Sequence, residues 1–96
     1  EDLGFCDKGE GPAFVRERRM THDGDFPNNT SGGQLSVGQA GAAGGFLGLT
    51  ETLRQLNGQA GERAVPNARL GLVGGFGMVT YYRCLCTGAV ILGAAP

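Results

Sequence analysis

The sequence has no cluster of basic residues, no long apolar run and no recognisable cysteine framework. Its eight Lys and Arg residues are scattered and balanced by nine acids, giving a formal net charge of -1. Binding to a nucleic acid would need Lys and Arg gathered on one surface, so we expect no nucleic-acid partner. The longest apolar run, residues 40–49, is too short to span a bilayer, so we expect no membrane span.

The three cysteines, Cys6, Cys84 and Cys86, are an odd number at spacings that match neither a zinc knuckle nor a disulfide framework. The first residues carry neither the basic flank nor the apolar run of a signal peptide. The one histidine, His22, lies in a polar stretch and is expected in a surface loop. These features predict a cytoplasmic protein without a metal site.

Glycine is the residue in excess, with 19 in 96 positions against a usual share of about 7%. Glycine loses the most conformational freedom on folding and adds no side chain to a core. We therefore expect this chain to be incomplete as an independent domain, either a fragment or a subunit.

Many of these glycines lie in residues 29–45, which run directly into the apolar pattern Phe46–Leu56. Steps of three and four between Phe46, Leu49, Leu53 and Leu56 predict a helix with one buried face, ended at 57–58. Glycines before a helix let a ligand or another backbone approach closely, so the stretch is a candidate floor for a site. The alternative is that Asn29 and the following glycines only form a turn.

The chain divides into a loop-rich lead-in (1–28), the glycine-rich loop and helix (29–58), and a strand, glycine turn and strand (68–96). In the lead-in, residues 1–6 read as the last turn of a helix and residues 13–15 as a short strand. Apolar runs at 68–73 and 84–92 predict the later strands, with Gly74-Gly-Phe-Gly77 breaking the first.

Four motifs carry a resemblance: Asn29-x-x-Gly-Gly-x-x-Ser-x-Gly38, Gln55-Leu-Asn-Gly-Gln-Ala-Gly61, Val65-Pro66 and Gly74-Gly-x-Gly77. Together they resemble the C-terminal end of the thiolase superfamily, in its sterol-carrier-type and acetyl-CoA acetyltransferase-like branch. The resemblance covers nearly the whole chain but only the C-terminal part of a family subunit. It implies an α/β fold class, with the helix packed on strands of a mixed sheet.

The resemblance implies an acyltransferase of lipid metabolism that makes or breaks carbon–carbon bonds in acyl-CoA thioesters. Coenzyme A would be part of the substrate, with no covalently bound cofactor. Where the family has Gly-His-Pro this chain has Gly38-Gln39-Ala40, and the family's second cysteine is missing near residues 71–73. Gln39 cannot transfer a proton near neutrality, but it can donate a hydrogen bond to a thioester oxygen. The substrate-binding residues that the motifs suggest are Asn29, Gly32, Gly33, Gly38, Gly74, Gly75 and Gly77.

Replacement acid–base groups are expected in residues 78–86, where the chain is longer than the family pattern. Tyr81, Tyr82 and Cys84 are the candidate proton-transfer residues, because Arg83 could lower the pKa of a phenol or thiol beside it. In an alternating strand Tyr81 would share a face with Arg83. The alternative is that the tyrosines cover the edge of the core and the cysteines are small buried hydrophobes.

Three functions remain open at this point. The chain could be part of a thiolase-type acyltransferase with Gln39 in its site, or part of a retro-aldolase acting on a CoA thioester. It could also be a non-catalytic subunit that completes a thiolase-like partner. The expected partners are the remainder of a thiolase-like subunit, further copies in a homo-oligomer and, in some branches of the family, a small protein with an OB-fold and a zinc ribbon.

Overall fold

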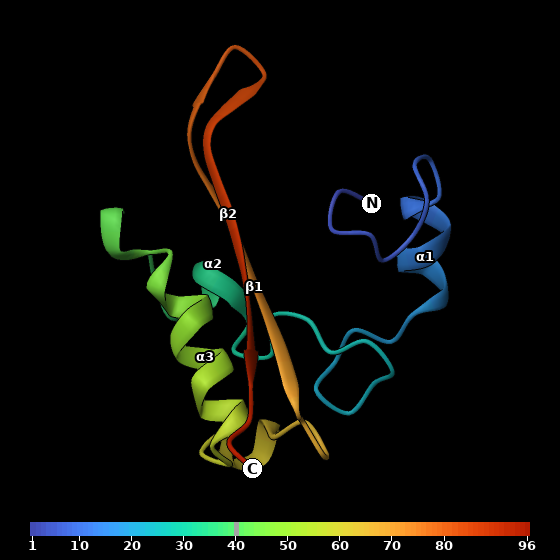
Figure 1. Ribbon diagram of the computed structural model, residues 1–96, viewed down its shortest axis with the longest axis vertical. Helices are drawn as coiled ribbons and strands as arrows, with labels where there is room; N and C mark the ends of the chain where they lie inside the picture. The colour runs from blue at the N-terminus through green and yellow to red at the C-terminus, as the bar shows by residue number, and fades with distance from the viewer. Residues whose placement is uncertain (40) are drawn as a thin grey trace.

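The computed structural model describes residues 1–39 and 41–96, with the backbone alone described at 42, 79 and 84. A long hairpin stands at its centre, with one helix along it and the N-terminal segment on its other side (Figure 1). Among the described residues no helix is long and apolar enough to cross a membrane. In chain order the elements are α1 (Gly11–Glu17), α2 (Gly33–Val37), η1 (Gly41–Ala43), α3 (Phe46–Leu56), η2 (Gly61–Arg63), β1 (Leu70–Thr80) and β2 (Arg83–Gly93).

The predicted helix is confirmed as α3, with the bounds that the apolar pattern gives. Its C-terminus is closed by Asn57, whose Nδ2 donates to the Leu53 carbonyl at 2.9 Å. Gly58 follows with φ of +68°, and the Gln59 amide donates back to the Arg54 carbonyl at 2.7 Å. A glycine in the left-handed region is the common way to end a helix, so sequence and structure agree at this boundary.

The predicted glycine turn is wrong, because β1 runs through Gly74, Gly75 and Gly77 without a break. β1 and β2 pair antiparallel from Leu70↔Gly93 to Thr80↔Arg83. A glycine inside a strand costs roughly 0.5–1 kcal/mol relative to alanine, and continuous cross-strand pairing outweighs that cost here. The α/β class with a helix packed on strands is confirmed, although the sheet formed by the described residues is antiparallel rather than mixed.

The hairpin turns at Tyr81 and Tyr82, whose φ values are +42° and +69°. Positive φ at both central residues is typical of the two-residue turn that matches the twist of a hairpin. Asn-Gly is the usual sequence there, so two tyrosines give no turn signal.

One prediction for the lead-in, the strand at residues 13–15, is also wrong. Residues 13–15 lie in α1, which Pro12 starts in its first turn, a position where proline suits a helix. Residues 1–6 form a turn in which Gly4, at φ of +79°, donates its amide to the Glu1 carbonyl at 2.9 Å. This agrees with Gly4 as the closing residue of a last helical turn, and the helix itself stays a prediction. Phe26 holds the segment together by edge-on contacts with Phe5 and Phe14, at 4.9 and 5.0 Å between ring centres.

α3 packs closely on one face of the hairpin because β1 presents a glycine there. A Cβ added at Gly71 would lie 2.3 Å from Cγ2 of Thr52, so a side chain at this position would require Thr52 or α3 to shift. Val73, two residues further along the same face, lies against Gly48 of the helix. Leu3 lies beside Gly74 on the opposite face.

The core is small. Among the described side chains only Ala60 and Glu51 are buried. Leu70, Phe76 and Ile91 of the hairpin are each more than two thirds exposed, at 73%, 74% and 68%. The open side of the sheet therefore presents apolar surface to solvent.

We expect the isolated 96-residue chain not to fold cooperatively as a monomer. Burial of apolar side chains is the dominant favourable term in folding, and this chain buries few of them while ordering many glycines. Far-UV circular dichroism during heating, together with size-exclusion chromatography, checks this expectation. A sharp, reversible melting transition in a monomeric sample would contradict it.

Candidate functional site

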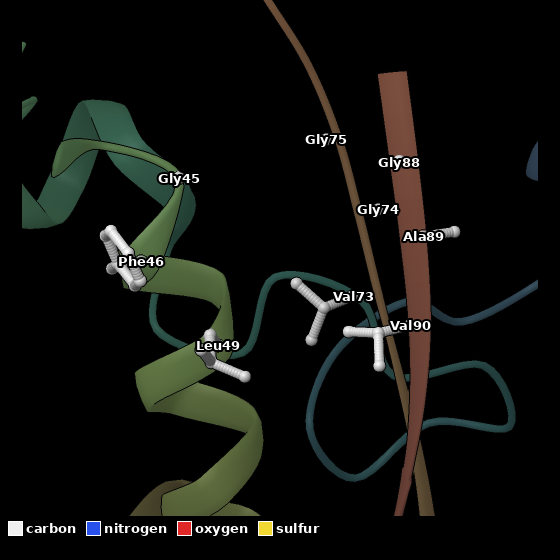
Figure 2. A pocket seen from close by; sticks show the side chains of 9 residues that line it. All are labelled: Gly45, Phe46, Leu49, Val73, Gly74, Gly75, Gly88, Ala89 and Val90. Atoms are coloured by element: carbon white, nitrogen blue, oxygen red, sulfur yellow. The ribbon is translucent and has the colours of Figure 1, made fainter. Parts of the chain in front are cut away.

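An apolar groove lies between the first turns of α3 and the glycine-containing part of the hairpin (Figure 2). Its volume is about 380 Å³. No side chain in its lining carries a charge or a hydrogen-bonding group, so it suits a hydrocarbon portion of a ligand. We call it the acyl groove; its lining is Gly45, Phe46, Leu49, Val73, Gly74, Gly75, Gly88, Ala89 and Val90.

The floor of the acyl groove is a pair of glycines facing each other across the hairpin, Gly75 and Gly88. A Cβ at either position would meet no atom within 4 Å, so the space above the pair is open. The next pair on this face, Val73 and Val90, points toward α3 in Figure 2. The groove is therefore narrowed by valine side chains at one end and floored by bare backbone at the other.

The structure brings only some of the predicted substrate-binding glycines into this groove. Gly74 and Gly75 line it, whereas Gly77 lies nearer the tip of the hairpin and does not. The remaining predicted residues, Asn29, Gly32, Gly33 and Gly38, flank or begin α2.

Asn29 has a left-handed φ of +48°, and the Gly32 amide donates to its carbonyl at 2.7 Å. Gly33 lies against the Asn29 side chain, and Gly32, Gly33 and Gly38 all have positive φ. These residues thus form the turns around α2, which is the alternative raised from the sequence. Their binding role stays a prediction.

Gln39 lies beside the backbone that leads into the acyl groove. A Cβ added at Gly44 would be 3.5 Å from its Cγ, and Gly44 directly precedes the groove residue Gly45. The Gln34 side chain fixes the same backbone by donating to the Gly44 carbonyl at 3.1 Å. The Gln39 side chain is exposed and so accessible to a ligand. Ala40, predicted to replace the family proline, lies outside the described residues.

The predicted proton-transfer residues lie away from the groove lining. Tyr81 and Tyr82 form the hairpin turn with exposures of 91% and 105%, and Figure 1 shows this tip extending beyond the helices. The argument that Tyr81 shares a strand face with Arg83 is wrong, because Tyr81 is in the turn and not in a strand. The side chain of Cys84 lies outside the described residues. Proton transfer by these three residues stays a prediction.

Sequence reasoning missed a polar cluster around Glu51, which is only 8% exposed. Its Oε1 accepts from Thr30 Oγ1 at 2.7 Å and from Gln55 Nε2 at 3.0 Å. Arg63 donates Nε to Oε1 at 3.1 Å and Nη2 to Oε2 at 2.9 Å. Gln55 extends the cluster by accepting the Val65 amide at 2.8 Å. We call Thr30, Glu51, Gln55 and Arg63 the Glu51 cluster. The cluster joins three segments, which are the turn before α2, α3 itself and the segment after α3.

The only sequence signal for this cluster is Glu51 and Gln55 at a spacing of four, which places them side by side on a helix. Glu51 thus lies on the polar side of α3, where Thr30 and Arg63 cover it. Hydrogen bonds from Arg63, followed by those from Thr30 and Gln55, lower the pKa of Glu51 from 4.5 to about 2 against the effect of burial.

The lowered pKa of Glu51 predicts acid sensitivity. The pKa of Glu51 is lower in the folded state than in the unfolded state. The contribution of the Glu51 charge to the free energy of unfolding is therefore fully present above pH 4.5 and is lost as the pH falls toward 2. The loss should amount to roughly 3 kcal/mol of unfolding free energy. This loss is measured by denaturant unfolding across this pH range of the assembled protein, by which we mean this chain together with the expected remainder of its subunit.

The matched control is Glu51→Gln, which keeps the shape of the side chain but cannot titrate. Its unfolding free energy should be lower at neutral pH and should lack the Glu51 component of the acid dependence. Identical pH profiles for the two proteins would show that the cluster does not stabilise the fold through the Glu51 charge.

Comparison with known proteins gives one family match and several relatives. Residues 1–92 match a family model described as thiolase C-terminal domain-like. Sterol carrier protein 2 of Rattus norvegicus is 40% identical over 88 residues, which are 86% of this chain and 16% of that protein. Acetyl-CoA acetyltransferase of Methanothermobacter thermautotrophicus is 41% identical over 80 residues, which are 80% of this chain and 21% of that protein.

A shorter match is to 17-hydroxy-3-oxo-4-pregnene-20-carboxyl-CoA lyase of Mycobacterium tuberculosis, 45% identical over 58 residues, or 60% of this chain and 14% of that protein. No solved structure shows a significant match. The chain thus spans 14% to 21% of the length of these curated relatives.

Proposed function

The chain belongs to the thiolase C-terminal domain-like family, and from this premise we propose that it forms the acyl-binding part of an enzyme acting on acyl-CoA thioesters. The resemblance seen in the sequence is confirmed at the level of the family. Two relatives carry CoA thioesters in their names, one an acetyltransferase and one a lyase. The proposed reaction makes or breaks a carbon–carbon bond next to the thioester.

The observation that carries this proposal is the acyl groove. Its apolar walls and glycine floor suit a hydrocarbon chain or ring lying flat against the hairpin. The groove opens beside the N-terminal end of α3, where the amide groups of the first turn carry a partial positive charge. An apolar acyl group in the groove would thus have its polar carbonyl end near hydrogen-bond donors.

Gln39 supplies the proposed side-chain donor at the groove mouth. In the resembling family a histidine stands in its position and takes a proton, which an amide cannot do. Gln39 can instead donate to an oxygen on which negative charge develops. We assign it this polarising role, with the proton transferred by another group, for which Tyr81, Tyr82 and Cys84 remain the candidates in this chain.

Retro-aldol cleavage is the second candidate reaction, and the lyase relative favours it. Such a cleavage needs a base and a polarised carbonyl but no cysteine nucleophile, in agreement with a glutamine at this position. In either reaction the chain would work with the remainder of a thiolase-like subunit, in a cytoplasmic homo-oligomer. A small OB-fold and zinc-ribbon protein is a further proposed partner.

Filling the floor of the acyl groove should weaken acyl binding. Gly88→Val adds a side chain where space is open, and valine suits a strand, so folding should be preserved. A mismatch of one methylene in an apolar pocket is worth about 1–3 kcal/mol, so the affinity for a medium-chain acyl-CoA should fall roughly tenfold or more. Calorimetric titration of the assembled protein measures the change.

Gly93→Val is the matched control, since it makes the same change in β2 outside the groove lining, where a Cβ would make only ordinary contacts. It should bind the acyl-CoA as the parent does. Equal weakening by Gly93→Val and Gly88→Val, or no weakening by Gly88→Val, would contradict the groove as the acyl site.

Gln39→Ala should lower turnover more than stability. The side chain is exposed, so its removal leaves no cavity, whereas loss of a donor to an oxyanion costs on the order of 3 kcal/mol of barrier. The expected result is a roughly hundredfold lower kcat with an unchanged Tm. Unchanged turnover at an unchanged Tm would remove Gln39 from the site.

A further inference from the structure

A second cavity lies on the side of α3 away from the hairpin. Gly48 and Thr52 face β1, whereas Thr50 and Arg54 share another face of the helix. The cavity has a volume of about 270 Å³ and is bounded by the turn before α2, by α3 and by η2. We call it the arginine cavity; its lining is Ser31, Val37, Leu47, Thr50, Glu51, Arg54 and Arg63.

The charges around this cavity leave one guanidinium uncompensated. The carboxylate of Glu51 is occupied on both oxygens by the Glu51 cluster, and Arg63 neutralises it. Arg54 makes no hydrogen bond or ion pair with any side chain that the structure describes. A guanidinium carries five N–H groups, and Arg63 uses only Nε and one hydrogen of Nη2 on Glu51, so both arginines keep donors for a ligand.

The other polar groups in the lining can also donate. Within the described part of the chain, neither the Ser31 nor the Thr50 hydroxyl takes part in a side-chain hydrogen bond. Val37 and Leu47 supply the apolar part of the lining, and Val37 is 51% exposed, so a ligand can enter from solvent on this side. The cavity therefore combines a net positive charge with unused donors from three segments.

We propose that the arginine cavity binds a phosphate group, with Arg54 as the principal ligand and Arg63, Thr50 and Ser31 as additional donors. The donors come from three separate segments, namely the turn before α2, α3 and η2. The oxygens of a tetrahedral phosphate can accept from several directions at once, whereas a carboxylate accepts mainly in its own plane. A guanidinium is also the side chain best matched to phosphate.

This phosphate site goes beyond the proposed acyl-CoA chemistry and does not depend on it. Its phosphate could belong to free phosphate, to the terminal phosphate monoester of coenzyme A or to another phosphorylated metabolite. Inorganic phosphate alone is a sufficient probe, so a failure of the acyl groove and a failure of the arginine cavity can be told apart.

The test is a calorimetric titration of the assembled protein with inorganic phosphate at low ionic strength. The parent should bind phosphate saturably, and Arg54→Gln should weaken binding roughly tenfold, the value of about one charge-assisted hydrogen bond. Glutamine is a good helix former, so α3 should be retained. The matched control is Arg69→Gln, which removes the same charge from an exposed arginine outside the cavity and should leave the affinity unchanged.

Additional titrations distinguish which molecule supplies the phosphate group. Coenzyme A and its dephospho form are compared, and a preference for coenzyme A that Arg54→Gln abolishes identifies the terminal phosphate monoester as the bound group. Arg54→Lys keeps the charge and should retain part of the affinity, which also covers the case in which Arg54→Gln fails to fold. Absence of saturable phosphate binding, equal weakening by Arg69→Gln, or equally tight binding of acetate would each overturn the proposal.

Discussion

The ion pair between Glu51 and Arg63 is the interaction on which the arrangement of this chain depends. Glu51 lies in the middle of α3, and its partners come from the segment before the helix and from the segment after it. Glu51 is nearly buried, whereas the side chain of Arg63 is 39% exposed. Removing Arg63 would leave the nearly buried carboxylate with only Thr30 and Gln55 as partners, which costs more than loss of an exposed pair. In a chain with so few buried apolar side chains, this cluster takes the place of a core. It fixes the rotation of α3 about its axis, and so decides which residues face the hairpin and which face the arginine cavity.

Close approach between α3 and the hairpin is the second constraint. Gly71 and Gly48 let backbone and side chain meet at distances that a Cβ on Gly71 would forbid. The same shortage of side chains continues along the hairpin at Gly75 and Gly88, where α3 no longer fills the space. The acyl groove is therefore a consequence of where the glycines lie. α3 contacts the hairpin tightly where Thr52 faces Gly71, and space stays open where Gly75 and Gly88 pair with each other.

A structural feature of this chain can be predicted from the sequence when the residues that signal it lie within one element. It is missed when it depends on residues that meet only in the fold. The helix α3 can be predicted because the spacing of its apolar residues and the glycine that ends it are local in the sequence. The hairpin is misread because Gly74 and Gly75 look like a turn in isolation, whereas pairing with β2 keeps them extended. Its real turn is hidden, since Tyr81 and Tyr82 adopt positive φ without a turn-forming residue. The Glu51 cluster depends on residues that meet only through the fold, and no spacing rule joins Thr30 to Arg63. Of the groove lining, the sequence singles out Gly74 and Gly75 but not the apolar walls, and substrate binding by these glycines and by Gln39 stays a prediction.

The position of α3 explains how one helix could serve two kinds of ligand group. One side faces the acyl groove, whose lining holds no titratable side chain, so this groove can bind and orient an acyl group but cannot itself move a proton. The other side carries Arg54 and faces Arg63 of η2, and these two guanidinium groups suit an anion. A proton-transfer group must therefore reach the groove from outside its lining. The exposed apolar residues Leu70, Phe76 and Ile91 lie on the opposite face of the sheet from the groove residues Val73 and Gly75. Covering them would stabilise the hairpin in proportion to the apolar area removed from water, but would not by itself bring a proton-transfer group to the groove.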